Sequence, residues 1–479
     1  MKKAVITKKD MYLFIIIFLL GTITTIFFLP FHTVPDTYNV LWRQQDYCTT
    51  FLQDGRIFSA LFLWLGEIIK IPINVLDVTS NIIALTVNCI SVYIIYKNIE
   101  NDDNDKFEKI ILFVGAFIVV FNQFSMEHLA YFETGIMCIG KMLCVISAQK
   151  LIVQNRKIKS LMILTIAMFC YQGILNVFVI TAIIFIATRT EKFKEIIKDI
   201  LKIVLICICV FIFVFIEIKI CNWVIGSQDK RAVINSMNKE NLKMIFEISI
   251  SILYLTFNIG VPNLIILTIT TTLIILLINK RYYPILQYLL YIIIIVGSCT
   301  ILILFTGRGT ISARTASAIG GIAGFSIIIL AKMTKENKVN LIAIFLLTII
   351  LFTANEYAYL RNGWILLKSN RMEKQYANAI IKQIKKYENE TGNLIKRIAI
   401  YKDKSSLKTF NNYKNNTFTI QSIHTTYARM DFLRYYLNRN VEIKEPEEKY
   451  TEYFKDRDCN EFDIKQLEFD GDTLHICTF

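Results

Sequence analysis

The sequence predicts an all-α polytopic membrane protein followed by a small α/β domain. Hydrophobic residues make up 54% of the 479 residues and charged residues 19%, whereas soluble chains have about 45–50% and about 25%. The apolar residues form long uninterrupted runs, as expected when a bilayer is the solvent. Polar composition returns after residue 356, and the remaining stretch is long enough for a small domain.

The first apolar run, Met11 to Pro30, follows four lysines within the first nine residues. It is long enough to span a bilayer, and no small-residue cleavage site follows it, so we expect a retained helix. The lysines favour a cytoplasmic N-terminus, which places the start of the loop 32–77 outside.

Two basic clusters, at 156–159 and 189–202, should both be cytoplasmic. The number of membrane crossings before each cluster must then be even, so the apolar patch Ile57 to Ile69 should lie flat on the outer surface. For the same reason Leu161 to Thr188 should cross to the outer face and come back, with its turn at Tyr171-Gln172-Gly173. Each arm is then short, which points to a site below the membrane surface or, alternatively, to local thinning of the bilayer.

Counting the remaining runs gives about eleven crossings, with the tail outside. The further spans are Val78–Tyr96, Ile110–Phe124, Thr134–Ile152, Ile203–Trp223, Pro262–Asn279, Ile285–Phe305, Ala318–Ala331 and Leu341–Asn355. We therefore expect a transmembrane domain at 1–356, with outer loop 32–77, and an extracytoplasmic α/β domain at 357–479.

The tail has signals for both helices and strands. We predict a strand at Arg397 to Tyr401 and a helix at Tyr427 to Leu437. Asp470-Gly471-Asp472 indicates the turn of a hairpin. Pairing of Cys459 with Cys477 is left open.

Three outer carboxylates are candidate functional groups. Asp36 follows the first helix, where a carboxylate can act as general base on an acceptor hydroxyl, although its position alone favours an ordinary solvated loop aspartate. Glu127 and Glu133 lie in an outer turn without lysine or arginine. They are suited to orient a sugar hydroxyl or hold a divalent metal, or they simply lie in a wetted turn.

Outer cations and polar groups complete the candidates. Arg56 precedes the flat patch and is suited to hold a lipid-linked phosphate, or to snorkel. Arg308 and Arg314 lie beside glycines that suit a pyrophosphate or, equally, helix packing. Tyr171 and Gln172, at the tip of the short hairpin, form a reasonable sugar contact, or an ordinary interfacial pair.

The sequence disfavours several classes of protein function. The sequence has no Walker A loop, Gly-x-Ser-x-Gly, His-Glu-x-x-His or Cys-x-x-Cys pattern, which disfavours ATP-driven transport, serine or zinc hydrolysis and a zinc site. Cytoplasmic loop lysines account for the net charge of +14, so we expect no nucleic-acid partner.

Taken in order, the outer motifs resemble a known family, the serotype-converting type II O-antigen glucosyltransferases of the GT-C class. The residues that carry the resemblance are Asp36, Gly55-Arg56, Phe124-Ser125-x-Glu127-x-Leu129-x-Tyr131-x-x-Thr134, Tyr171-Gln172, Arg308, Arg314 and the polar tail.

The resemblance implies a GT-C-like fold in a bacterial plasma membrane. It further implies a sugar donor linked to polyprenyl phosphate and transfer on the outer face to a cell-surface glycan or lipid-linked acceptor. Asp36 takes the position of the family's catalytic aspartate. The family has paired acidic residues there, so Asp46, Asp54 and Glu127 remain alternatives.

The expected mechanism is a single displacement, in which the acceptor hydroxyl gives its proton to Asp36 and attacks the anomeric carbon. Arg56, Arg308 or Arg314 holds the departing phosphate; a divalent cation is compatible with this scheme but not required. A surface-polysaccharide polymerase or ligase and a lipid-linked glycan flippase or transporter are the alternatives. The polar residues gather at the outer ends of the helices, which favours an enzyme.

Overall fold

The computed structural model describes residues 7–101, 103–190, 192–226, 239–254, 257, 259–279, 281–306, 312–333, 338–402, 418, 422, 428–455 and 463–478. The chain divides into two compact units. Unit 1 comprises Met1–Pro30 and Cys48–Arg361, and unit 2 comprises Phe31–Tyr47 and Asn362–Phe479. This division differs from the boundary expected at residue 356, chiefly because residues 31–47 of the expected outer loop belong to unit 2.

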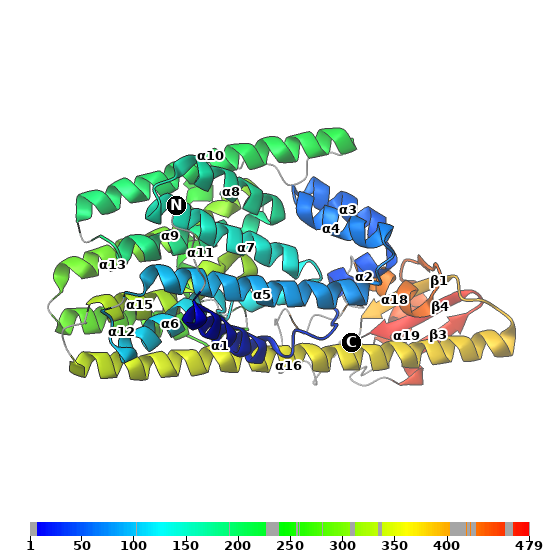
Figure 1. The fold of residues 1–479 in the computed structure, drawn as a ribbon. Coiled ribbons are helices and arrows are strands. Elements are labelled where there is room, and N and C mark those ends of the chain that lie inside the picture. Colours follow the sequence, from blue (N-terminus) through cyan, green and yellow to red (C-terminus); the bar gives the residue numbers. More distant parts are fainter. Residues whose placement is uncertain are drawn as a thin grey trace. The chain divides into compact units, whose positions relative to one another are not determined.

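Unit 1 is a bundle of helices (Figure 1). Its α-helices are α1 (Lys8–Thr25), α4 (Ile57–Ile68), α5 (Ile73–Ile99), α6 (Lys106–Val120), α7 (Thr134–Ala148), α8 (Lys157–Cys170), α9 (Leu175–Ala187), α10 (Phe193–Ile225), α11 (Lys239–Tyr254), α12 (Leu264–Ile278), α13 (Tyr282–Thr306), α14 (Ser317–Gly320) and α15 (Ile322–Met333). A π-helical segment, η2 (Gln149–Val153), extends α7. Two further helices, α3 (Gln44–Gln53) and α16 (Lys338–Thr391), belong partly to unit 1 and partly to unit 2.

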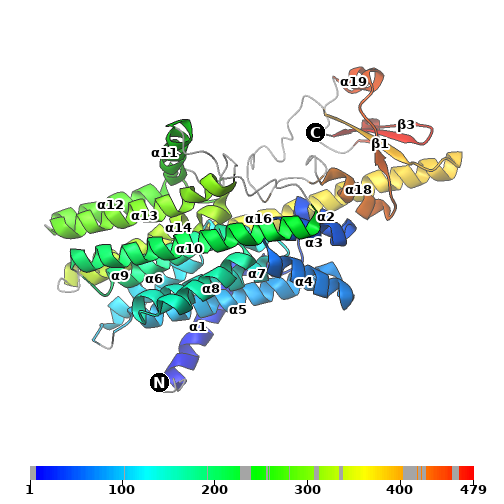
Figure 2. The same ribbon diagram turned by 90° about the horizontal axis from the view of Figure 1, so that it is seen from above.

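Helix α7 packs against α5, α8 and α9 (Figure 2). Helix α6 packs against α15. Glycines allow the closest approach: a Cβ added at Gly324 on α15 would lie 2.4 Å from the Gly115 carbonyl oxygen on α6. Small residues at such crossings let helix backbones pack by van der Waals contact, which is the usual basis of helix association in a bilayer.

Within the described residues, six helices are long and apolar enough to cross a membrane, so the expectation of about eleven crossings is wrong. The six are Ile73–Ile99, Thr134–Val153, Phe193–Ile225, Tyr282–Thr300, Ala313–Lys332 and Leu341–Thr391. Helix α9 illustrates the reason for the discrepancy. All residues from Leu175 to Ile186 are buried in the protein, so its apolar composition reflects a protein environment on every side.

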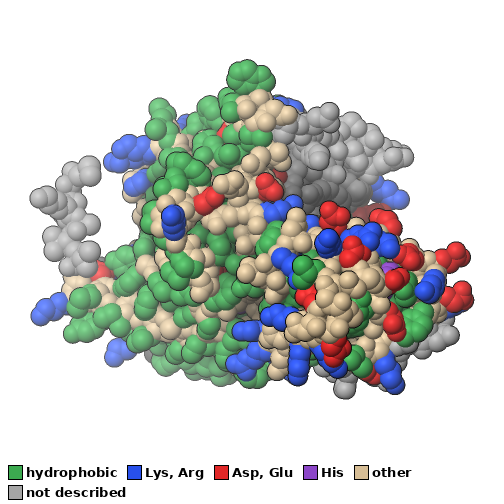
Figure 3. Space-filling model, turned by 90° about the vertical axis from the view of Figure 1, so that its right-hand side faces the viewer, with side chains coloured by type: hydrophobic (Ala, Val, Ile, Leu, Met, Phe, Trp, Pro, Cys, Tyr) green, Lys and Arg blue, Asp and Glu red, His purple; other side chains and the backbone are tan. Residues whose placement is uncertain are grey.

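The side of α10 that points away from the helix bundle has the exposed apolar side chains expected of a lipid-facing helix. Apolar side chains recur on it every three or four residues and remain exposed: Leu201, Leu205, Ile208, Ile212, Ile216 and Ile220. Exposed hydrophobic side chains are also widespread on the surface shown in Figure 3. Apolar surface on this scale indicates membrane association.

Unit 2 contains a four-stranded sheet with strand order β2-β1-β4-β3. Its strands are β1 (Arg397–Lys402), β2 (Glu442–Ile443), β3 (Leu467–Asp470) and β4 (Thr473–Thr478), and α19 (Glu448–Phe454) packs against β1. Strand β1 pairs in parallel with β2 and β4, while β3 and β4 form an antiparallel hairpin. The predicted strand and hairpin are therefore present. Cys459 lies outside the described residues, so its pairing with Cys477 stays untested.

Helix α2 (Pro35–Trp42) packs in unit 2 against α18 (Arg429–Leu437), the helix that the sequence predicts at 427–437. The Tyr38 ring contacts Phe432 edge to face at 5.0 Å between centroids. Arg43 Nε donates a hydrogen bond to Asp431 Oδ2 at 2.8 Å. The segment after the first helix is thus held to the tail by an aromatic contact and an ion pair.

Candidate functional site

Three short 3₁₀ segments meet in unit 1, where longer apolar helices are interrupted. They are η1 (Ser125–Ala130), η3 (Gln172–Ile174) and η4 (Ala313–Ala316), and η4 contacts both of the others. The α-helical conformation is interrupted between α8 and α9 at Tyr171, where the sequence predicts a turn. Interrupted helices expose backbone groups and place polar side chains at membrane depth, a common basis for binding sites.

Arg56, the residue before α4, is surrounded by carboxylates and an aromatic ring. Its Nη1 lies 3.5 Å from Glu133 Oε1, and its Nη2 lies 3.9 Å from Asp54 Oδ2. The guanidinium carbon lies 4.8 Å from the centre of the Tyr171 ring. The buried Nε has no hydrogen-bond partner among the described residues, which leaves one donor of this cation available to a ligand.

Arg314, on η4, approaches the same tyrosine from another segment. Its Nε donates a hydrogen bond to the Tyr171 hydroxyl at 3.1 Å. Its guanidinium carbon lies 4.0 Å from the centre of the Tyr131 ring. The backbone N–H donates to Glu127 Oε2 at 2.8 Å. Tyr171 therefore contacts two arginines at once, by its ring face and by its hydroxyl.

The loop that carries Arg56 is held by Gln172. The Gln172 Nε2 donates hydrogen bonds to the carbonyl oxygens of Asp54, at 3.0 Å, and of Gly55, at 2.8 Å. Gly55 adopts φ +71°, a left-handed conformation that a side chain strains. The predicted contact of Gln172 with a sugar stays a prediction; in the structure its amide nitrogen positions the arginine loop.

Asn176, at the start of α9, fixes η4 and the start of α14. Its Nδ2 donates to the carbonyl oxygens of Gly173, at 3.0 Å, and Thr315, at 2.7 Å. Its Oδ1 accepts from Ser317 Oγ at 3.0 Å and from the Ala318 N–H at 3.2 Å. All four bonds of one amide are thus used to hold the segment that carries Arg314.

Burial shifts the two titratable groups of η1 toward their neutral forms. The pKa of Glu127 is raised because burial penalises its charge, although Arg314 opposes the shift. The pKa of His128 is lowered well below its usual range by burial and by the nearby cations Lys141 and Arg314. The His128 Nδ1 lies 3.1 Å from the Ser125 carbonyl oxygen, an arrangement in which a neutral imidazole donates from Nδ1.

The structure brings six predicted residues into one cluster, which we call the Arg56–Arg314 cluster: Arg56, Glu127, Glu133, Tyr171, Gln172 and Arg314. Asp36 lies in the first turn of α2, in unit 2, and Arg308 lies outside the described residues.

Sequence reasoning missed two residues of the surroundings, Asn176 and Glu217. Glu217 lies on α10 beside Gly55, where a Cβ would meet its Oε2 at 2.6 Å. A sequence signal existed for it, since Glu217 directly follows the uninterrupted apolar run from 203 to 216, and a carboxylate in such a helix suggests function.

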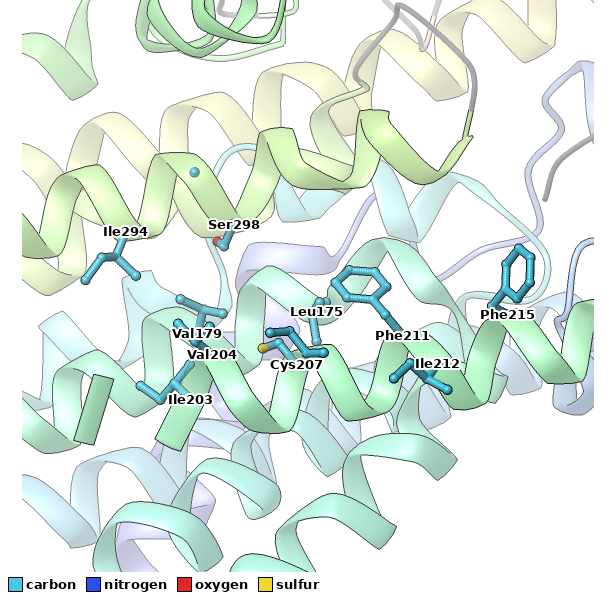
Figure 4. Close-up of a pocket in the computed structure, with 12 residues that line it drawn as sticks. Leu175, Val179, Ile203, Val204, Cys207, Phe211, Ile212, Phe215, Ile294 and Ser298 are labelled. Atoms are coloured by element: carbon cyan, nitrogen blue, oxygen red, sulfur yellow. The ribbon is translucent and has the colours of Figure 1, made fainter. Parts of the chain in front are cut away.

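An apolar groove of about 420 Å³ lies between α9, α10 and α13. Figure 4 shows the side chains that line it, most of which lie on α10 between Ile203 and Phe215; Ser298, on α13, is the single polar one. The thirteen positions from Ile203 to Phe215 correspond to about 18 Å of helix. Two lining residues are close in sequence to the Arg56–Arg314 cluster and to Glu217. Leu175 is three positions after Gln172, and Phe215 is two positions before Glu217.

Among the described residues, no group of three or more histidine, cysteine, aspartate or glutamate side chains is arranged to hold a metal ion. No family model, curated protein or solved structure matches the chain.

Proposed function

We propose that the protein is a GT-C-like membrane glycosyltransferase that moves a hexosyl group from a polyprenyl-phosphate carrier to a cell-surface glycan or lipid-linked acceptor. The observation that carries the proposal is the pair of arginines, Arg56 and Arg314, that contact one tyrosine, Tyr171. Guanidinium groups held in a fixed orientation suit phosphate oxygens, because their planar fork donates two parallel hydrogen bonds.

The groove between α9, α10 and α13 supports a lipid-linked donor. It is lined almost entirely by hydrocarbon side chains, and two lining residues, Leu175 and Phe215, lie three and two positions from Gln172 and Glu217 in the sequence. An isoprenoid chain in the groove would gain favourable burial along its length. Its phosphate would then lie near the polar cluster, as a donor requires.

In the proposed reaction, the acceptor hydroxyl attacks the anomeric carbon of the donor sugar and gives its proton to Asp36. The bond from that carbon to the phosphate oxygen breaks, and Arg56 and Arg314 neutralise the charge that develops on the phosphate. The buried carboxylates Glu127 and Glu133 keep the two arginines in position and accept sugar hydroxyls. We place the reaction on the outer face of the bacterial plasma membrane, where no nucleotide sugar is needed.

A sugar-transfer assay in membrane vesicles tests this proposal. Wild-type vesicles should transfer labelled hexose from polyprenyl-phosphate hexose, Arg56→Lys should weaken transfer, and Asp36→Asn should abolish it. Asp103→Asn, at an exposed position, is the matched control. Full transfer by Asp36→Asn would exclude Asp36 as the base, and absence of transfer by the wild type would exclude the function.

One observation favours a flippase or transporter as the second candidate. Lys141 lies within the apolar helix α7 and is 3% exposed, and its Nζ donates to the Val120 carbonyl oxygen at 3.4 Å. Buried cations in spanning helices often mark transport pathways. Lipid translocation without sugar transfer, lost in Lys141→Leu, would establish this alternative.

A further inference from the structure

One carboxylate beside the Arg56–Arg314 cluster has no arginine as a partner among the described residues. The Glu217 Oε1 accepts a weak hydrogen bond from Cys221 Sγ at 3.5 Å. The Oε2 is buried and has no hydrogen-bond partner in the described part of the chain. The residue as a whole is 8% exposed, so the missing partner is costly.

The position of Glu217 directs this oxygen at the loop that carries Arg56. A Cβ added at Gly55 would lie 2.6 Å from Glu217 Oε2 and 2.8 Å from Gln172 Nε2. Gly55 directly precedes Arg56, whose Nε is also buried without a hydrogen bond in the described part. The acceptor thus lies beside Gly55, and the donor belongs to the next residue in the chain; both have unused hydrogen-bonding capacity.

We infer that Glu217 is a ligand-binding residue, whose Oε2 accepts a hydrogen bond from a sugar hydroxyl of a ligand that has its phosphate on Arg56. This inference rests on the proposed function and names the chemistry of its ligand as a hexosyl phosphate. A carboxylate oxygen accepts strongly from a hydroxyl, and Arg56 supplies the complementary charge for the phosphate. Glu127 and Glu133 each have an arginine within 4 Å, whereas among the described residues the Glu217 Oε2 has its full hydrogen-bonding capacity left for a further hydroxyl of the sugar.

The test uses two soluble probes, glucose 1-phosphate and inorganic phosphate, titrated calorimetrically into the detergent-solubilised full chain. The wild type should bind glucose 1-phosphate about 10–100-fold more tightly than phosphate, the range expected for a hydrogen bond to a charged group. Glu217→Leu should remove this preference without weakening phosphate binding. Glu217→Gln, which keeps one acceptor, should be intermediate.

Control variants separate the sugar contact from a structural role. Glu195→Leu, at an exposed position on the same helix, should keep the preference. Arg56→Lys should weaken the binding of both probes. Because a buried carboxylate oxygen without a hydrogen-bond partner costs stability, Glu217→Leu should unfold at or above the wild-type temperature.

The outcomes distinguish the inference from the function on which it rests. An unchanged preference in Glu217→Leu, with phosphate binding intact, would overturn the role of Glu217 alone. A wild type that binds neither probe would overturn the phosphate site itself, and with it this inference.

Discussion

Arg314 Nε donates a hydrogen bond to the Tyr171 hydroxyl at 3.1 Å, across 143 residues of sequence. The bond joins η4 to the break between α8 and α9, so it aligns one arginine of the cluster with the ring that contacts the other. The geometry of the two cations therefore depends on a single phenol.

Removal of the phenol oxygen should loosen Arg314 and leave the Arg56 contact in place. We expect Tyr171→Phe to weaken binding of a polyprenyl-phosphate sugar only about 2–10-fold, because Arg314 loses one positioning hydrogen bond but keeps its contact with the Tyr131 ring. The measurement is the KM for the lipid donor in vesicles. Its effect and that of Arg314→Lys should not add in the double variant, because both break the same contact; strict additivity would argue that the bond is unimportant.

Arg56 should not tolerate lysine. The ammonium loses the planar fork and much of the contact with the Tyr171 ring. We expect Arg56→Lys to weaken phosphate binding about 10–100-fold, by titration calorimetry, with little change in the unfolding temperature. Arg156→Lys, at an exposed position, should behave as wild type. Equal affinity for phosphate in both variants would remove Arg56 from the anion site.

Gly55→Ala should destabilise unit 1 for two separable reasons. The left-handed φ of +71° costs about 1 kcal/mol, and the new methyl group meets Ile218 Cγ1 and Glu217 Oε2 at 2.6 Å, which adds about 1–3 kcal/mol. Gly226→Ala isolates the first contribution, because Gly226 has the same φ and nothing within 4 Å. Thermal unfolding of both variants gives the steric part as a difference, and equal losses would contradict it.

Asn176→Asp should destabilise the segment that carries Arg314. The Asn176 Nδ2, which donates to the carbonyl oxygens of both Gly173 and Thr315, would become one oxygen that faces both of them. We expect a loss of about 2–6 kcal/mol, since two buried acceptors are left unpaired. Urea unfolding measures the loss, and Asn393→Asp, at an exposed position, is the control. A loss as small as that of the control would show that these bonds contribute little.

Strand β4 should lose protection as the pH falls below about 6.5. The pKa of His475 is lowered, first by burial, while the unfolded chain retains a value near 6.5. The unfolded state therefore binds the proton more readily, and stability decreases from about pH 6.5 down to the folded pKa. Glu447, whose pKa is lowered chiefly by Lys444, titrates below this window.

Hydrogen exchange of residues 473–478 at pH 7.5 and 5.5 measures the effect. Comparison with His475→Gln at each pH cancels the intrinsic pH dependence of exchange. The wild type should lose more protection on acidification than the variant; identical losses would exclude His475 as the cause.

The sequence predicts local structure in this protein well where chain geometry alone decides it. The turn at Tyr171–Gly173 follows from the length of the apolar run between basic clusters, and the hairpin at 470–472 follows from its turn residues. The span count failed because the criterion for apolar composition does not distinguish lipid from protein surroundings. Helix α9 is surrounded by protein along almost its whole length, so it needs neither the length nor the exposure of a spanning helix.

The candidate site was predictable by residue type but not by arrangement. Arg56 and Glu133 lie 3.5 Å apart across 77 residues, a proximity that depends on how α4 and α7 pack. The role of Gln172 as a brace for the Arg56 loop likewise depends on contacts over 117 residues. Such long-range contacts have no local signature, because neither partner must differ in type from an ordinary polar residue.

The ion pair between Arg43 and Asp431 has a consequence for biosynthesis. The two partners are 388 positions apart, so at ordinary translation speeds α2 leaves the ribosome roughly 20–80 s before its partner helix exists. During that interval Tyr38 lacks the aromatic neighbours that cover it in the finished protein. In the nascent chain, residues 31–47 therefore lack the partners that hold them in the finished protein until synthesis is nearly complete.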